Sequence, residues 1–167
     1  MSEQIHFEPT PEKTVQLLRI IHGALILGVI TMGVFMLPGM LQKVQGAPGP
    51  INFIPIVIAA GGLMGSFIVP QVVLGGAIKE LSKGDPLHVE GGLLNAFMTS
   101  RIARGALLEG PAFINIVMID PHRPYLHLGI VAFLLAGIAL SIPSLGGLNE
   151  WLRIQKESLS MESGSKD

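Results

Sequence analysis

The sequence predicts an all-α, polytopic membrane protein built as a bundle of four transmembrane helices. Of its 167 residues, 49% are hydrophobic and only 14% are charged, and the mean hydropathy is +0.57. Ordinary soluble domains carry about 25% charged residues, so this chain has too few charges to cover a soluble surface. Its apolar runs also approach the roughly 20 residues that a helix needs to cross the hydrocarbon core of a bilayer.

Four spans are expected within a single membrane domain of residues 1–167. The first, at about residues 15–40, follows an acidic start and is too long for the apolar region of a signal peptide, so we expect it to be retained. The second, at about 53–78, follows a connection rich in Gly and Pro. The third, at about 97–119, follows the turn signal Gly84-Asp85-Pro86. The fourth, at about 125–145, follows a short turn that contains two prolines.

Residues 146–167 are predicted to lie in the cytoplasm. Residues 148–159 have the pattern of an amphipathic helix along the membrane surface, and a disordered tail is expected from Ser158 onward. With four spans, nine of the eleven Lys and Arg residues fall on the side that holds both termini. Positive residues favour the cytoplasmic side, so the N and C termini are both expected there.

An internal repeat relates the two halves of the chain. Residues 19–36 and 101–118 are identical at seven of 18 positions without a gap, including one matched Arg and two matched Gly. This similarity predicts two tandem helical hairpins, spans 1–2 and spans 3–4, related as parallel repeats.

Small residues spaced four apart predict close helix packing, because they let helix backbones approach one another in a membrane. Their contacts could join helices within one bundle or join copies into a homo-oligomer. The predicted packing residues are Ala24, Gly28, Gly61, Gly65, Gly105, Ala132 and Ala136.

Glu109 is the candidate for ion or proton binding. It lies about twelve residues into the third span, roughly 18 Å along the helix axis and thus near the bilayer midplane. An ionisable residue at that depth is costly and usually indicates function. Two interpretations stay open: a protonated carboxyl that carries protons, or a buried structural group that hydrogen-bonds a neighbouring helix.

A basic ring is expected at the cytoplasmic mouth of the bundle. The repeat pairs Arg19 with Arg101 and His22 with Arg104, so these four side chains would gather if spans 1 and 3 are adjacent. Long basic side chains commonly reach the lipid phosphates. The ring therefore predicts either lipid contacts that set the topology or a site for an anionic ligand.

Several chemistries are not expected. The chain has no cysteine, and it contains no phosphate-binding loop, dinucleotide fingerprint, HExxH motif or Ser–His arrangement. His122 and His127 lack the spacing typical of metal ligands. The net charge of -1 gives no indication of nucleic-acid binding. We therefore expect no enzyme, no cofactor and no metal, and as partners membrane lipids, a homo-oligomer or a larger membrane complex.

The segment ALLEGPAF, Ala106 to Phe113, carries a resemblance to an uncharacterised family of small bacterial four-span membrane proteins, and that resemblance covers most of the chain. It implies location in the bacterial inner membrane. The chain also partly resembles the proteolipid, subunit c, of rotary ATPases, in which a mid-membrane Glu binds the coupling proton or sodium ion. That resemblance implies the same role for Glu109, although this Glu lies on the first helix of its pair and the proteolipid carboxylate on the second.

Three function classes follow from these observations. The favoured one is a non-enzymatic subunit or scaffold of a membrane assembly, with Glu109 as a buried structural group. The alternatives are a proteolipid-like protein that translocates protons or ions through Glu109, and a small transporter or channel that works as an oligomer.

Overall fold

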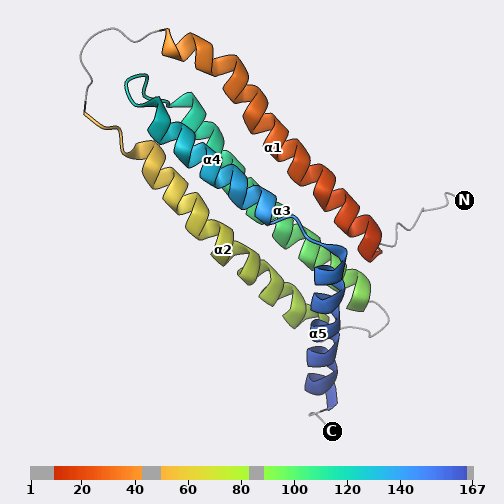
Figure 1. Ribbon diagram of the computed structural model, residues 1–167. Coiled ribbons are helices and arrows are strands. Elements are labelled where there is room, and N and C mark those ends of the chain that lie inside the picture. The colour runs from red at the N-terminus through yellow and green to blue at the C-terminus, as the bar shows by residue number, and fades with distance from the viewer. Residues whose placement is uncertain (1–9, 43–49, 83–88, 165–167) are drawn as a thin grey trace, which may run out of the picture.

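The computed structural model describes residues 10–42, 50–82 and 89–164. Within these ranges the chain is all-α, as predicted, and forms five helices and no strand. Figure 1 shows them as α1 (Pro11–Leu41), α2 (Ile54–Leu81), α3 (Val89–Val117), α4 (Pro124–Leu140) and α5 (Leu145–Gly164).

Two helices are long and apolar enough to cross a membrane, namely α1 over Pro11–Gly39 and α2 over Ile54–Leu81. A third crossing is reached if α4 and α5 are taken as one span, which is bent by 64° at the break between them. By contrast, α3 carries three charged side chains in its central part, namely Arg101, Arg104 and Glu109. These two or three apolar helices are compatible with an integral membrane protein.

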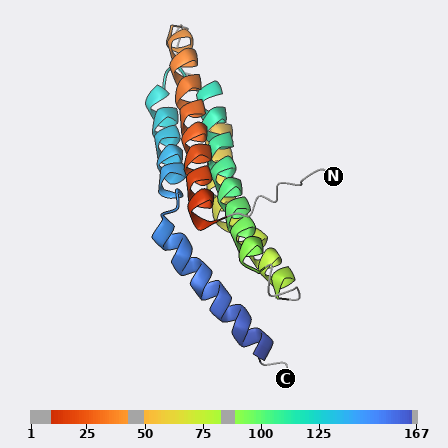
Figure 2. The same cartoon turned by 90° about the vertical axis from the view of Figure 1, so that its right-hand side faces the viewer.

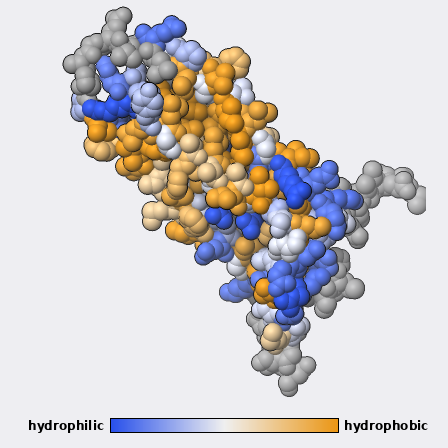
Figure 3. Space-filling model, viewed as in Figure 1, coloured by the Kyte–Doolittle hydropathy of each residue, from blue (hydrophilic) through white to orange (hydrophobic). Residues whose placement is uncertain are grey.

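The exposed surface supports the same conclusion. Figure 3 shows a broad hydrophobic area over α1, α2 and α4, and hydrophilic side chains gathered toward α5. Large apolar side chains are widely exposed, among them Phe35 at 80% and Leu140 at 87%. Soluble monomers rarely expose apolar patches of more than a few hundred Å². A surface of this kind is suited to contact with lipid.

The central helix of the bundle is α3, which packs against all four other helices. Figures 1 and 2 show α1 and α3 running in one direction and α2 and α4 in the opposite one. Among the described residues, α1 and α2 make no close backbone contact and lie on different sides of α3 and α4. The first predicted hairpin is therefore wrong as a packed unit. Because α1 and α2 are almost uniformly apolar, neither has a distinct face for packing against the other. Helix α3, in contrast, has polar and small residues that neighbouring helices shield from lipid.

Two apolar clusters stabilise the bundle. The first lies among α1, α2, α3 and α4, and its buried members are Val29, Ala59, Leu108, Ala112, Ile116, Val131, Leu134 and Ile138. The second fixes α5 against the ends of α1 and α3, and its buried members are Val15, Leu18, Leu93, Leu94, Phe97, Leu148 and Leu152. The position of α5 is thus set by buried side chains of the bundle.

Helix boundaries differ from the prediction at the C-terminal side. The third helix begins at Val89, before the expected residue 97, and α4 ends at Leu140. The predicted disorder from Ser158 is wrong as far as Gly164, because α5 continues to that residue. Ion pairs of Arg153 with Glu150 and Glu157, three and four residues away, support this helix. The predicted turn at residues 84–86 and the last three residues lie outside the described ranges.

The small residues take two different positions. Gly28, Gly65 and Gly105 lie at helix contacts within the bundle. Another four are exposed on the outward faces of their helices, so a role in contacts between copies of the chain stays a prediction for them: Ala24, Gly61, Ala132 and Ala136.

Helices α2 and α3 approach each other closely at Gly62. A Cβ atom on Gly62 would overlap the Pro111 ring and lie 2.5 Å from the Leu107 carbonyl oxygen, whereas a Cβ on Gly61 would meet nothing within 4 Å. On α2 the contact with α3 is therefore made by Gly62 and Gly65, whereas the prediction paired Gly61 with Gly65.

Candidate functional site

The carboxyl group of Glu109 lies at the contact between α1 and α3. Its Oε1 atom is 3.8 Å from the position that a Cβ on Gly28 would occupy, and the Phe113 ring is 3.5 Å from the same position. Leu108 and Ala112, on either side of it, are buried, whereas Glu109 itself is half-buried. The structure thus places Glu109 beside α1, without the full burial that the sequence predicted.

Glu109 has no hydrogen bond or ion pair with any side chain or backbone group in the described part of the chain. Placing a carboxyl group in an apolar environment without hydrogen-bond partners costs free energy on the order of several kcal/mol. It must therefore be protonated, hydrated or covered by a group from outside this chain. Each of these states is compatible with one of the predicted roles.

A second candidate site is a cavity of about 180 Å³ between α2, α3 and α5. We call it the arginine cavity, because Arg101 and Arg104 of α3 both line it. The other lining residues are Ser66, Phe67, Pro70, Gln71, Leu74, Phe97, Ser100 and Trp151.

Aromatic rings hold both guanidinium groups of the arginine cavity. The Cζ atom of Arg101 lies 4.9 Å from the centroid of the Phe97 ring, and that of Arg104 lies 5.0 Å from the Phe67 centroid. The Phe97 ring is itself packed against Trp151, with centroids 5.0 Å apart. Helix α5 therefore completes the cavity through Trp151.

The arginine cavity carries uncompensated positive charge. Arg101 and Arg104 are close enough to repel each other. Within the described residues neither guanidinium is paired with a carboxylate. The Nε atom of Arg104 is buried and has no hydrogen-bond partner there.

The other two members of the predicted basic ring lie elsewhere. His22 is fully buried, and its Nδ1 donates to the Leu18 carbonyl oxygen at 2.7 Å. Its Nε2 faces Gly105 and has no hydrogen-bond partner among the described residues. Arg19 is exposed on α1 and does not line the cavity. The structure thus brings two of the four predicted residues together in one cavity.

A buried polar network near the opposite end of the bundle was not predicted. Asn115 is fully buried, and its amide nitrogen donates to the carbonyl oxygens of Pro55, at 3.1 Å, and Pro111, at 3.0 Å. Its amide oxygen accepts a hydrogen bond from Nδ1 of His127 at 3.2 Å. The network joins α2, α3 and α4. The only signal in the sequence was an amide side chain within an apolar run.

The predicted absence of a metal site stays a prediction. Over residues 10–42, 50–82 and 89–164 no group of three or more His, Asp or Glu side chains is placed to hold a metal ion. Asp120 instead accepts a hydrogen bond from the His122 backbone at 2.9 Å and lies 3.7 Å from the Arg123 guanidinium.

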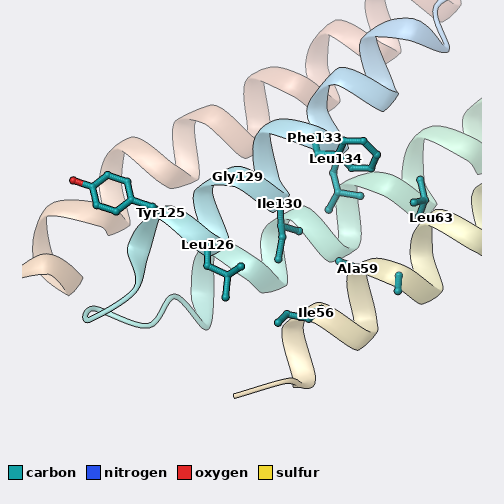
Figure 4. Close-up of a pocket in the computed structure, with 10 residues that line it drawn as sticks. Ile56, Ala59, Leu63, Tyr125, Leu126, Gly129, Ile130, Phe133 and Leu134 are labelled. Carbon is teal, nitrogen blue, oxygen red and sulfur yellow. The ribbon is translucent and has the colours of Figure 1, made fainter. Parts of the chain in front are cut away.

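A larger groove, of about 480 Å³, lies between α2 and α4. Figure 4 shows its apolar side chains, with Tyr125 directed away from the others at one end. The lining residues are Ile56, Ala59, Ala60, Leu63, Tyr125, Leu126, Gly129, Ile130, Phe133 and Leu134. Apart from the Tyr125 hydroxyl they offer no ionisable group, so the groove contributes no chemistry to either candidate site.

Comparison of the chain with protein families, with curated proteins and with solved structures gives no match.

Proposed function

We propose that the chain is a four-span integral membrane protein with both termini in the cytoplasm. Its central helix, α3, lies between α1 and α2, so a bilayer crossed by those two helices also surrounds α3. Helix α4 has 17 residues and is therefore roughly 25 Å long, close to the thickness of the hydrocarbon core. Helix α5, with its exposed ion pairs, then lies outside the membrane.

The orientation is supported by the distribution of charge. The start of α1, the end of α2, the start of α3 and all of α5 lie toward the same end of the bundle. Basic side chains of that end include Lys13, Lys79, Arg101 and Lys156. Because positive residues favour the cytoplasmic side, this end is the inner one, and the bacterial inner membrane is the matching location.

Within this topology the chain acts as a non-enzymatic subunit or scaffold of a membrane assembly. The observation that carries this proposal is the half-buried and unpartnered carboxyl of Glu109 at the contact between α1 and α3. A helix from a partner, or from a second copy, would cover the carboxyl and supply a hydrogen-bond donor. Such a bond within a membrane is worth about 1–2 kcal/mol, which is enough to favour one partner over lipid.

Proton or ion handling is the second candidate, and the same carboxyl supports it. No basic side chain of the described residues holds Glu109 in an ion pair, so the carboxyl is free to exchange a proton or a cation. The two functions differ in what they need from this residue. A structural contact needs a hydrogen-bonding group, whereas proton transfer needs a group that titrates.

Two substitutions separate these functions. Glu109→Gln keeps hydrogen bonding but cannot titrate, and Glu109→Leu keeps only the volume. The full chain is extracted from membranes in a mild detergent, and the size of its complex is measured by native electrophoresis. For a subunit, Glu109→Gln retains the wild-type complex and Glu109→Leu loses it. Glu150→Gln, on the exposed surface of α5, is the matched control and leaves the complex unchanged.

Labelling by a hydrophobic carbodiimide provides the second measurement, because this reagent modifies protonated carboxyls that lipid can reach. For a subunit, the assembled wild type is labelled weakly at every pH, since a partner covers Glu109. Strong labelling that fades as pH rises, with an intact complex in both Glu109 variants, would favour proton handling. A wild-type chain that runs as a monomer would contradict the subunit proposal.

A further inference from the structure

We infer that the arginine cavity is a binding site for a phosphate group, carried either by the headgroup of an anionic lipid or by a free phosphate ester. The inference concerns a different part of the bundle from Glu109 and does not depend on the role of that residue.

The donors in the cavity match the oxygens of a phosphate. A guanidinium group presents its N–H groups in a planar fork that binds phosphate oxygens in pairs. The guanidinium carbons of Arg101 and Arg104 lie over the rings of Phe97 and Phe67, and neither guanidinium is paired with a carboxylate among the described residues, so both can donate to an added anion. The buried Nε of Arg104 already lacks an acceptor among the described residues.

Neutral donors line the same cavity. The amide of Gln71, on α2, and the indole of Trp151, on α5, each carry N–H groups that can donate to oxygen. The hydroxyl of Ser100 at present donates to its own helix, to the Phe97 carbonyl oxygen at 2.8 Å. Three helices therefore contribute donors, and no carboxylate lines the cavity to oppose an anion.

Charge also favours an anion. Two guanidinium groups that repel each other without a carboxylate partner are unfavourable in a partly buried cavity. An anion bound between the two guanidinium groups would attract both of them and so offset their mutual repulsion. Hydrogen bonds between charged partners are roughly twice as strong as neutral ones, so one phosphate can engage both side chains.

Size and position narrow the class of ligand. A volume of about 180 Å³ corresponds to roughly six water molecules at about 30 Å³ each. This is enough for a phosphate group and part of its ester. Trp151 of α5 lines the cavity, and α5 lies at the end of the bundle that we place in the cytoplasm. Basic pockets at that level of a membrane protein are suited to anionic headgroups.

The chain contains one tryptophan, Trp151, and that residue lines the cavity, so its fluorescence reports binding directly. The full chain in a neutral detergent is titrated with dioctanoyl phosphatidylglycerol, with dioctanoyl phosphatidylcholine, with glycerol 3-phosphate and with inorganic phosphate. The wild type is expected to show a saturable change with phosphatidylglycerol. Saturation by glycerol 3-phosphate or inorganic phosphate at similar concentrations would identify a free phosphate as the ligand.

Three variants locate the site. Arg104→Gln is expected to weaken binding on the order of tenfold, because it removes charge-assisted hydrogen bonds. Arg104→Lys keeps the charge and is the variant expected to preserve the fold, but it loses the planar fork, so binding weakens by about threefold or more. Arg19→Gln removes the same charge from the exposed surface of α1, and binding stays within about twofold of the wild type.

Circular dichroism and the emission maximum of Trp151 without ligand show whether each variant keeps its fold. The inference is overturned if no probe gives a saturable change in the wild type. It is also overturned if Arg19→Gln weakens binding as much as Arg104→Gln, since attraction to the basic end in general would then explain the data. Equal binding of phosphatidylcholine and phosphatidylglycerol would likewise contradict it.

Discussion

Replacing Gly62 by alanine tests a close contact between α2 and α3. A Cβ atom at this position would lie 2.5 Å from the Leu107 carbonyl oxygen and overlap the Pro111 ring. Carbon atoms pack at about 3.5–4.0 Å, so α2 and α3 would have to separate by about 1 Å. Neither the backbone carbonyl nor the proline ring can rotate out of the way. The substitution therefore acts on the packing of the whole helix pair.

The expected magnitude follows from two opposing effects. A gap of 0.5–1 Å removes about a quarter to a half of the dispersion attraction at each affected contact, and overpacking typically costs about 1–3 kcal/mol. Alanine is favoured over glycine within a helix by about 1 kcal/mol, which offsets part of the loss. We expect Gly62→Ala to lower the free energy of unfolding by about 0–2 kcal/mol relative to the wild type, and by about 1–3 kcal/mol relative to an alanine placed in the same helix where it meets no neighbour.

Gly61→Ala is the matched control, because it makes the same chemical change one residue earlier, where a Cβ meets nothing within 4 Å. Its helix-propensity gain is not opposed, so its stability is expected to equal or exceed that of the wild type. Both variants are unfolded by adding sodium dodecyl sulfate to neutral micelles, with helicity followed by circular dichroism. Equal stability of the two variants would refute the predicted α2–α3 contact at Gly62.

Two further outcomes are expected from the polar groups. Asn115→Ala leaves the Pro55 carbonyl and His127 without their hydrogen-bond partner and should lower the free energy of unfolding by about 1–3 kcal/mol. The control is Ser141→Ala, a buried residue whose hydroxyl bonds only its own helix, and it should lower the free energy of unfolding by less than about 1 kcal/mol. Equal losses in the two variants would contradict the stabilising role of the network. Hydrogen bonding by Arg153 holds the pKa of Glu150 below its usual range, so its contribution to α5 is present above about pH 4.3 and is lost as pH falls through the lowered pKa. Protection of α5 against hydrogen exchange, corrected for the slower intrinsic exchange of amides in acid, should therefore fall at low pH, and Glu150→Gln should remove part of that loss of protection.

The helices themselves could be predicted because each depends mainly on the length of an apolar run. The predicted spans at residues 15–40 and 53–78 lie within a few residues of α1 and α2. An apolar run of this length is sufficient to predict a helix, because a helix makes all its backbone hydrogen bonds within the segment. The helical content of α5 beyond Ser158 was missed, because a short polar sequence at the end of a chain has the same composition in a helix as in a disordered tail.

The pairing of helices could not be predicted in the same way. Helices α1 and α2 are apolar on nearly all sides, so their sequences do not predict which face of each helix packs against a neighbour. Gly62 and Gly65, and not Gly61, lie against α3. Gly105 was predicted to lie at a helix contact, and the structure places Leu25 and His22 of α1 beside it; the sequence did not indicate which helix would be its neighbour.

The candidate sites were predictable to different degrees. Arg101 and Arg104 are three residues apart on one helix, so their proximity follows from helix geometry alone. The rest of the arginine cavity comes from α2 and α5, and residues such as Gln71 and Trp151 carry no pattern that links them to α3. The surroundings of Glu109 likewise depend on α1, which places Gly28 beside it only after the bundle has assembled.

The central claim, that four helices cross the membrane with both termini in the cytoplasm, is tested most directly by labelling single cysteines. The natural chain has no cysteine, so each introduced thiol is the only target. Intact cells that express the chain are treated with a membrane-impermeant maleimide, before and after permeabilisation. We predict that cysteines replacing Ile51 and His122 are labelled in intact cells, and that those replacing Thr10, Ser82 and Ser160 are labelled only after permeabilisation. Labelling of positions 82 and 122 from the same side would show that α3 does not cross the membrane and would contradict the four-span topology.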